Sequence, residues 1–164
     1  SGAVQKDIPV DSYVLSDYAL GFDGVLHFYE HEGLCDDEFS KAFVKHTNWS
    51  DKKPWPYLVQ CDTTLRETLA SNRIRYGVTG TNSGFYGPQG RKLRLNLQDD
   101  TLNDLKITNL EMESSAIYGL SKLLGHQAVS LNCIIANRVL GEFSENPRKT
   151  INGLIKYTLD KLTK

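Results

Sequence analysis

The spacing of apolar and polar residues predicts strands alternating with helices in the first half of the chain. The expected strands cover 10–16, 58–61 and 74–79, where β-branched and aromatic residues form alternating or short apolar runs. The expected helices cover 36–47 and 62–72, each opened by an Asp and followed by apolar residues at helical spacing. The segment 20–29 contains two glycines and is expected to be a loop with a short strand.

The second half is more regular and predicts a helix, a strand and a final helix. Thr108 is expected to precede the first helix, which runs to about Gly125; the strand is expected over 128–137, and Pro147 starts the last helix. The apolar stripes expected to face the core are Met112, Ala116, Leu120, Leu123 and Leu124 in the first helix, and Ile151, Leu154, Ile155, Tyr157, Leu159 and Leu162 in the last. No repeat or linker divides the pattern, so we expect a single α/β domain over 1–164.

Composition narrows the class of protein. The 164 residues include 19 Lys and Arg against 20 Asp and Glu, a balance that argues against a nucleic-acid partner. Three cysteines without CxxC spacing indicate reduced thiols and a cytoplasmic protein. No apolar run approaches the length of a membrane helix, so no membrane partner is expected.

A glycine-rich loop over 83–92 follows the expected strand at 74–79. One interpretation is a surface turn whose glycines serve geometry alone. The other is a pocket for a flat heterocycle, in which Phe85 stacks on the ring while the Gln89 amide and the Arg91 guanidinium bind ring polar atoms. The loop lacks the spacing of a dinucleotide or P-loop motif.

A second cluster, 109–115, opens the helix expected after Thr108. One interpretation needs no ligand. Glu111 would form a capping box with Thr108, and Glu113 would be an acidic residue in the first turn, where the helix dipole favours a negative charge. The functional alternative is a carboxylate that accepts both hydroxyls of a ribose, with Met112 packed under the sugar.

A third candidate is Arg138, which directly follows the expected strand at 128–137. Pockets of open α/β sheets lie at the carboxyl ends of strands, where this Arg falls, although an ordinary surface Arg is the better explanation when the residue is taken alone. The four histidines show no metal spacing, so no metal site is expected.

Taken together, these motifs resemble the nucleoside phosphorylase family, in particular its uridine phosphorylase branch. The resemblance rests on FYGPQGR at 85–91, TNLEMESSAIYGLSKLLGH at 108–126 and IIANR at 134–138, in that order, and on DIPVDSYVLSDYALGFDG at 7–24. It implies a mixed central β-sheet flanked by helices. It also implies roles for single residues: Phe85, Gln89, Arg91 and Arg138 at uracil, Met112 and Glu113 at ribose, and Glu111 nearby.

The resemblance further implies a pentosyltransferase that converts uridine and phosphate into uracil and ribose 1-phosphate in pyrimidine salvage. Inorganic phosphate is then a co-substrate, and no cofactor is expected. Purine-specific relatives place an Asp at the end of the late strand, where this chain reads Ala136-Asn137-Arg138. Uridine is therefore favoured over a purine nucleoside, while a purine nucleoside phosphorylase and a nucleosidase remain the alternatives.

The same resemblance indicates that the chain is the C-terminal portion of such an enzyme. Ser1-Gly2 matches the inside of a glycine-rich turn that contacts phosphate and ribose in the family, so Ser1 is expected beside those groups. The remaining phosphate residues have no counterpart here. We therefore expect a fold incomplete at its N-terminus and inactive by itself, which associates with the missing part or with copies of itself. The alternative is an inactive nucleoside-binding fragment.

Overall fold

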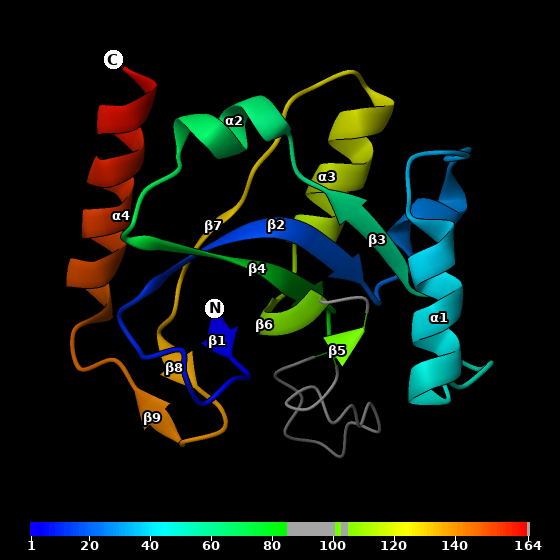
Figure 1. The fold of residues 1–164 in the computed structure, drawn as a ribbon, viewed down its shortest axis with the longest axis horizontal. Coiled ribbons are helices and arrows are strands. Elements are labelled where there is room, and N and C mark those ends of the chain that lie inside the picture. The colour runs from blue at the N-terminus through cyan, green and yellow to red at the C-terminus, as the bar shows by residue number, and fades with distance from the viewer. Residues whose placement is uncertain (85–100, 103–104, 164) are drawn as a thin grey trace.

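The computed structural model describes residues 1–84, 101–102 and 105–163, and its strands form one mixed sheet (Figure 1). The strands are β1 (Gly2–Ala3), β2 (Tyr13–Gly21), β3 (Tyr57–Gln60), β4 (Ile74–Thr81), β5 (Thr101–Leu102), β6 (Leu105–Glu111), β7 (Leu131–Cys133), β8 (Ala136–Asn137) and β9 (Glu142–Phe143). The helices are α1 (Asp37–Thr47), α2 (Thr63–Thr68), α3 (Ser114–Leu123) and α4 (Pro147–Leu162), with a short 3₁₀ helix at η1 (Val25–Phe28).

The sheet combines parallel and antiparallel pairs. Its order is β3-β2-β4-β6-β1-β8-β9, with β7 paired to β2 and β5 paired to β6. Strands β2, β4 and β6 are parallel neighbours, whereas β1 is antiparallel to β6 and parallel to β8. Helices α4 and α1 lie at opposite sides of the sheet in Figure 1, with α2 and α3 along its top. The expected α/β class, a mixed central sheet flanked by helices, is confirmed.

Two helices begin where the polar pattern predicts. Asp36 caps α1, its Oδ1 accepting the Phe39 N–H at 2.8 Å, and Phe39 and Phe43 enter the core. Asn146 caps α4 just before Pro147 and accepts a hydrogen bond from the backbone of the helix. The local capping chemistry is thus enough to fix both helix starts.

Other first-half elements exist but have different bounds. Strand β2 begins at Tyr13 rather than at residue 10, because Asp11 adopts a positive φ of 64° in the preceding turn. Asp62 caps α2 as expected, yet the helix ends at Thr68. Its C-cap residue Leu69 is 2% exposed, so burial of that side chain takes the chain out of the helix and into the core.

The expectation of a helix starting just after Thr108 is wrong. Residues 105–111 form β6, which pairs with β4 on one side and β1 on the other. Thr108 and Asn109 are 4% and 0% exposed inside this sheet. The capping-box interpretation of Thr108 with Glu111 is therefore wrong as well, and the helix begins only at Ser114.

The apolar segment 128–137 is two short strands rather than one long one. Strand β7 pairs with β2, and β8 pairs with β1. Between them the chain changes partner: the Ile134 N–H donates to Ser12 O, and the Ile135 N–H donates to Ser1 O. Apolar periodicity cannot reveal such an exchange, because both halves are equally hydrophobic.

Helix α3 buries small and polar residues together with part of the expected stripe: Leu120 and Leu123 pack against the core, whereas Met112 and Leu124 do not. Met112 precedes the helix and is 39% exposed, and Leu124 is 69% exposed. At Gly119 an added Cβ would lie 2.5 Å from a methyl carbon of Leu26, so only glycine permits this close approach. The most deeply buried residues of α3 are Ser114, Ser115, Tyr118 and Gly119.

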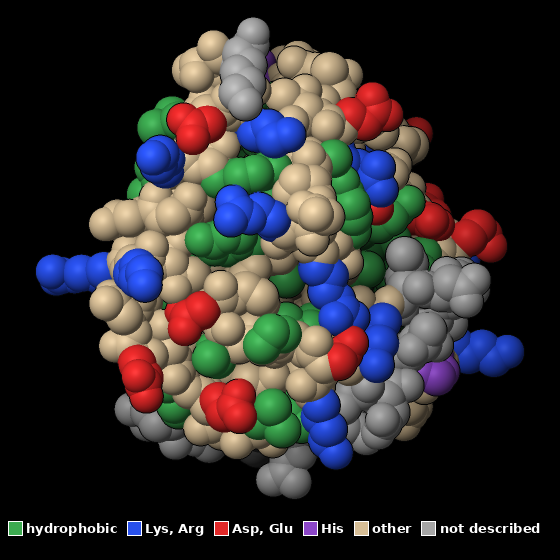
Figure 2. Space-filling view, turned by 60° about the vertical axis from the view of Figure 1, so that its left-hand side comes forward, with side chains coloured by type: hydrophobic (Ala, Val, Ile, Leu, Met, Phe, Trp, Pro, Cys, Tyr) green, Lys and Arg blue, Asp and Glu red, His purple; other side chains and the backbone are tan. Residues whose placement is uncertain are grey.

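Helix α4 leaves much of its apolar stripe at the surface. Leu154 is buried, but the larger part of the stripe is 40–56% exposed, namely Ile151, Ile155, Leu159 and Leu162. A groove of about 500 Å³ runs between α4 and α2. Figure 2, turned so that the α4 side comes forward, shows hydrophobic side chains at the surface between Lys and Arg. Within the described ranges, no helix has the length and apolar character needed to cross a membrane.

Candidate functional site

The expected ribose and phosphate residues meet where β6 ends beside β1. Ser1 precedes β1, and the register pairs Gly2 with Leu110, so Ser1 lies next to the end of β6 and Glu111. A hollow of about 410 Å³ opens here, with Ser1, Glu111 and Glu113 on its polar side and isoleucines of α3 and α4 among its apolar walls. The structure thus brings together residues more than one hundred positions apart in the sequence.

Glu111 uses its carboxylate to organise the start of α3. One oxygen accepts the Thr81 hydroxyl at 2.6 Å, and the other accepts the backbone N–H groups of Glu113 and Ser114, both at 2.8 Å. These donors would otherwise be unpaired at the helix N-terminus. Glu111 therefore caps the helix from the adjoining strand, and its oxygens are engaged within the protein.

Glu113 is the carboxylate that faces outward. It occupies the N-cap position of α3, is exposed, and lines the hollow. Its Oε2 accepts the Met112 N–H at 3.2 Å. A negative charge is favoured at this end of a helix, and an exposed carboxylate retains lone pairs for the hydroxyls of a ligand. Met112 is the neighbouring side chain, half-exposed just ahead of the helix.

Ser1 is held by a buried chain of amide and hydroxyl groups. Its Oγ donates to Leu110 O at 3.1 Å and accepts the Asn109 Nδ2 at 2.7 Å. Asn109, fully buried, accepts the hydroxyls of Thr79 at 3.1 Å and Thr108 at 2.8 Å. Buried polar groups of this kind are costly unless paired, and here they fix one residue at the edge of the hollow.

The amino group of Ser1 lies close to several titratable side chains. Burial lowers its pKa, while Cys133, Glu111 and Glu113 act in the opposite direction and Arg138 reinforces the lowering. The geometry agrees, because Glu111 and Glu113 line the same hollow as Ser1 and the Arg138 side chain lies over the adjoining Gly2.

Arg138 approaches this region from the other end of β1. Because β8 is parallel to β1 and antiparallel to β6, its carboxyl end lies beside Ala3, and the Arg138 N–H donates to Ala3 O at 2.9 Å. The side chain lies over Gly2, where an added Cβ would be 3.1 Å from Nε. The backbone of β8 ends beside Ala3, but the Arg138 side chain runs back over Gly2 and so brings its positive charge towards Ser1.

Sequence reasoning missed Asp23, which supports the first turn of α3. Its carboxylate accepts the hydroxyls of Tyr57 and Ser115, each at 2.6 Å, and the Val25 N–H at 2.9 Å. The Ser115 N–H in turn donates to the Thr81 hydroxyl at 3.0 Å. An Asp-Gly pair inside the apolar segment 20–29 was the available signal, since such pairs favour turns with local side-chain bonds.

The expected uracil residues Phe85, Gln89 and Arg91 lie outside the described residues, so their roles stay predictions. The start of their loop is described: β4 ends at Thr81, and the Asn82 N–H donates to Glu111 O at 3.1 Å. The loop therefore leaves the sheet next to Glu111, at the edge that carries the hollow.

The cysteines are not prepared for nucleophilic chemistry. All three are free thiols, as expected, and burial raises the pKa of Cys35 to about 11 and that of Cys61 to about 12. Burial also raises the pKa of Cys133. A raised pKa keeps a thiol protonated and unreactive near neutral pH. Across the part of the chain that the structure describes, no three His, Cys, Asp or Glu side chains gather as a metal site would require.

A family profile described as the Phosphorylase superfamily matches residues 1–155. The chain belongs to this superfamily. A curated uridine phosphorylase from Thermococcus kodakarensis is 27% identical over 161 residues, an alignment that covers 91% of this chain and 50% of the relative. The chain thus spans about half the length of that relative.

A solved structure of the superfamily fold agrees with this assignment. The crystal structure of a Trypanosoma brucei nucleoside phosphorylase, described as showing uridine phosphorylase activity, matches with a TM-score of 0.76 at 22% identity. The match covers 99% of this chain and 61% of that one. The resemblance drawn from the sequence motifs is confirmed, and the mixed sheet of this superfamily member is the fold of a nucleoside phosphorylase.

Proposed function

We propose that the chain carries the base and ribose part of a uridine phosphorylase site. The reaction converts uridine and inorganic phosphate into uracil and ribose 1-phosphate. Phosphate is a co-substrate in this reaction, and we propose no cofactor. The observation that carries the proposal is that Ser1 and Glu113 line one hollow while the Arg138 side chain lies over Gly2, the residue after Ser1. A carboxylate can accept the hydroxyls of a sugar diol, and a guanidinium can donate to the carbonyl oxygens of a base.

The proposed roles follow from the charge that develops during the reaction. The bond between C1′ and uracil N1 breaks, its electron pair leaves with the base, and a phosphate oxygen bonds to C1′ from the opposite face. Glu113 accepts the ribose hydroxyls while positive charge grows on the sugar, with Met112 beneath it. Phe85 stacks on the ring, and Gln89, Arg91 and Arg138 stabilise the negative charge on the uracil oxygens. Such interactions strengthen in the transition state.

Calorimetry with uridine and with inosine tests the substrate class on the chain as it exists. We expect uridine to bind more tightly than inosine. Tighter binding of inosine would favour a purine nucleoside phosphorylase, and binding without any turnover in the assembled enzyme would favour an inactive nucleoside-binding fragment.

A uracil-release assay separates phosphorolysis from hydrolysis. Any turnover of uridine is expected to require inorganic phosphate and to yield ribose 1-phosphate. Uracil release that ignores phosphate would contradict the proposal and indicate a nucleosidase, because water would then be the nucleophile.

We further propose that the chain is inactive by itself and associates through the exposed face of α4 with a polypeptide carrying the rest of the phosphorylase domain. The support is the half-length match to the curated relative and the position of Ile151 and Ile155, which line the same hollow as Glu113. A covering polypeptide would bury this apolar face and complete the hollow at once. The free thiols support the cytoplasm as the location.

Light scattering after size-exclusion chromatography tests this association. We expect the isolated chain to self-associate as concentration rises, because the α4 face is uncovered, and we expect Leu159→Lys to reduce that association. Asp160→Asn is the matched control, because it adds the same unit of positive charge at an exposed position of α4 outside the apolar stripe. A chain that stays monomeric at all concentrations and unfolds cooperatively would contradict the proposal, and association unaffected by Leu159→Lys would place it on another surface.

A further inference from the structure

Asn137, the last residue of β8, uses its side-chain amide to hold two segments together. Its Nδ2 donates to Gln5 O at 2.9 Å and to Ile8 O at 2.8 Å, and its Oδ1 accepts the N–H groups of Val139 at 2.9 Å and Leu140 at 3.0 Å. The side chain is 1% exposed. Two donors and two lone pairs are all an amide has, so its full hydrogen-bonding capacity is used here.

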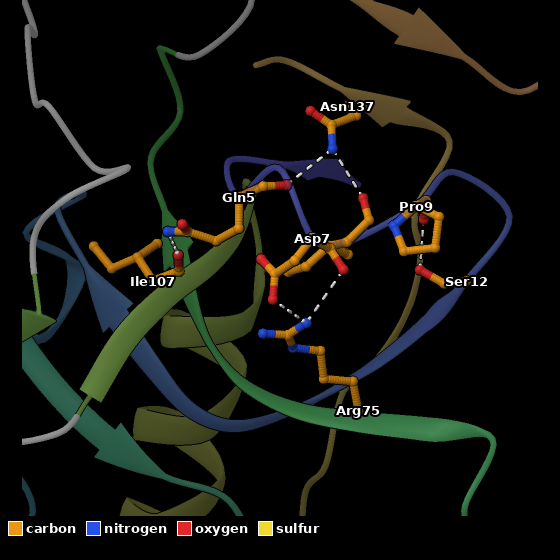
Figure 3. A network of polar contacts seen from close by, with 8 residues as sticks. Gln5, Asp7, Pro9, Ser12, Arg75, Ile107 and Asn137 are labelled. Atoms are coloured by element: carbon orange, nitrogen blue, oxygen red, sulfur yellow. Dashed lines mark hydrogen bonds and ion pairs between the residues drawn. The ribbon is translucent and has the colours of Figure 1, made fainter. Parts of the chain in front are cut away.

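The segment that Asn137 holds is itself anchored to the sheet (Figure 3). The Gln5 Nε2 donates to Ile107 O of β6 at 2.6 Å, and the Asp7 carboxylate pairs with Arg75 of β4 at 2.9 Å. Through these contacts the Asn137 amide fixes the turn after β8 relative to two central strands. Arg138 lies between the amide and the turn, so the direction of its backbone is set from both sides.

Gly2 provides the surface on which the Arg138 side chain lies. An added Cβ at Gly2 would be 3.1 Å from Nε and 3.6 Å from Cδ and Cγ of that side chain. The closest of these contacts is shorter than ordinary van der Waals contact, so the methyl would push the Arg138 side chain off Gly2 by a few tenths of an ångström and leave the backbone pairing of β1 in place.

We propose that Asn137 and Gly2 are positioning residues, which together direct the Arg138 side chain along β1 towards Ser1. Asn137 sets the backbone from which the side chain leaves, and Gly2 leaves the space along which it runs. The placement of Arg138 stands on these contacts; the consequence for base binding rests on the proposed function.

The Nε–H signal of Arg138 in ¹⁵N NMR tests the placement without any ligand. It is assigned by its loss in Arg138→Lys. We expect an ordered signal in the wild type and a shift towards the value of a mobile arginine in both Gly2→Ala and Asn137→Asp. Leu69→Ala is the control, because Leu69 is buried in a cluster with Leu15, Tyr57 and Tyr118, so its truncation lowers stability without touching β8. An unchanged Arg138 signal in Gly2→Ala overturns the proposal, even if Asn137→Asp fails to fold.

A double-mutant cycle with uracil tests the consequence. Gly2→Ala and Asn137→Asp should weaken uracil binding by roughly tenfold in the wild type, but hardly at all in an Arg138→Leu background, because residues that act through a shared partner are not additive. Equal losses in both backgrounds would show a merely structural role and overturn the proposal. If the wild type binds no uracil, the NMR result alone decides the placement, and the proposed function is what fails.

Discussion

Glu113→Gln is expected to weaken binding of uridine by roughly tenfold to a hundredfold, because a hydrogen bond to a charged group contributes about 1.5–3 kcal/mol and one between neutral groups about 0.5–1.5 kcal/mol. The side chain lines the hollow at the N-cap of α3 and is the carboxylate proposed to accept two ribose hydroxyls. Gln keeps the size of the side chain but loses its charge and half of its accepting capacity. Calorimetry with uridine measures the effect directly.

Glu67→Gln is the matched control for that experiment. Glu67 is exposed on α2, away from the hollow, and its replacement removes the same charge from the chain. We expect it to leave uridine affinity unchanged. Equal uridine affinities for wild type and Glu113→Gln would show that the ribose lies elsewhere. The Glu67→Gln variant accounts for any effect of simply removing one negative charge.

Gly21→Ala is expected to destabilise the fold by about 1–3 kcal/mol or more, the cost of overpacking a filled core. A Cβ at Gly21 would lie 2.3 Å from Cζ of the Tyr57 ring, which is 2% exposed and has no room to retreat. Displacing the ring would also disturb the hydrogen bond from Tyr57 to Asp23, and with it the support of Ser115. Urea denaturation measures the change in the free energy of unfolding.

A second background isolates the cause of that loss. In Tyr57→Leu the ring is absent, so adding Gly21→Ala should cost much less than it costs in the wild type. An equal cost in both backgrounds would mean that the alanine acts on the β2 backbone rather than on the ring, and would refute the packing explanation.

Helices whose ends are fixed locally could be predicted from the sequence. Asp36 and Asn146 cap α1 and α4 through their own side chains, so the information lies within four residues of each start. The strand β4 was also found at its expected start, because its apolar run is bounded by polar turns. These elements depend little on what packs against them.

Elements defined by distant partners could not be predicted in the same way. The polar run Thr108–Glu111 looks like a helix start, yet in the sheet those side chains bond to Thr79, Thr81 and Ser1. The split of β7 from β8 likewise depends on which strand lies alongside. In both cases the decisive contacts join residues that the local pattern cannot relate.

The candidate site shows the same division. Motif resemblance named Ser1, Glu111, Glu113 and Arg138; the fold places the first three on one hollow and the Arg138 side chain over Gly2 of β1. It gave no role to Asn137 or Asp23, whose contributions are hydrogen bonds to backbone and hydroxyl groups across the fold. Such supporting residues follow no characteristic spacing in the sequence, so only the folded structure shows them.

Strand β1 is two residues long, yet it joins two portions of the sheet. Among the described residues, the β8–β9 hairpin reaches β6 through the ladder only by way of Gly2 and Ala3. Transient fraying of this short seam would therefore release the hairpin from the ladder and leave the Asn137 amide as its link to the Gln5–Ile8 segment, while β2 and β4 remained intact. Amide protons of β1 should consequently exchange with solvent deuterium sooner than those of the central strands, because β1 is the part of the ladder that opens most readily.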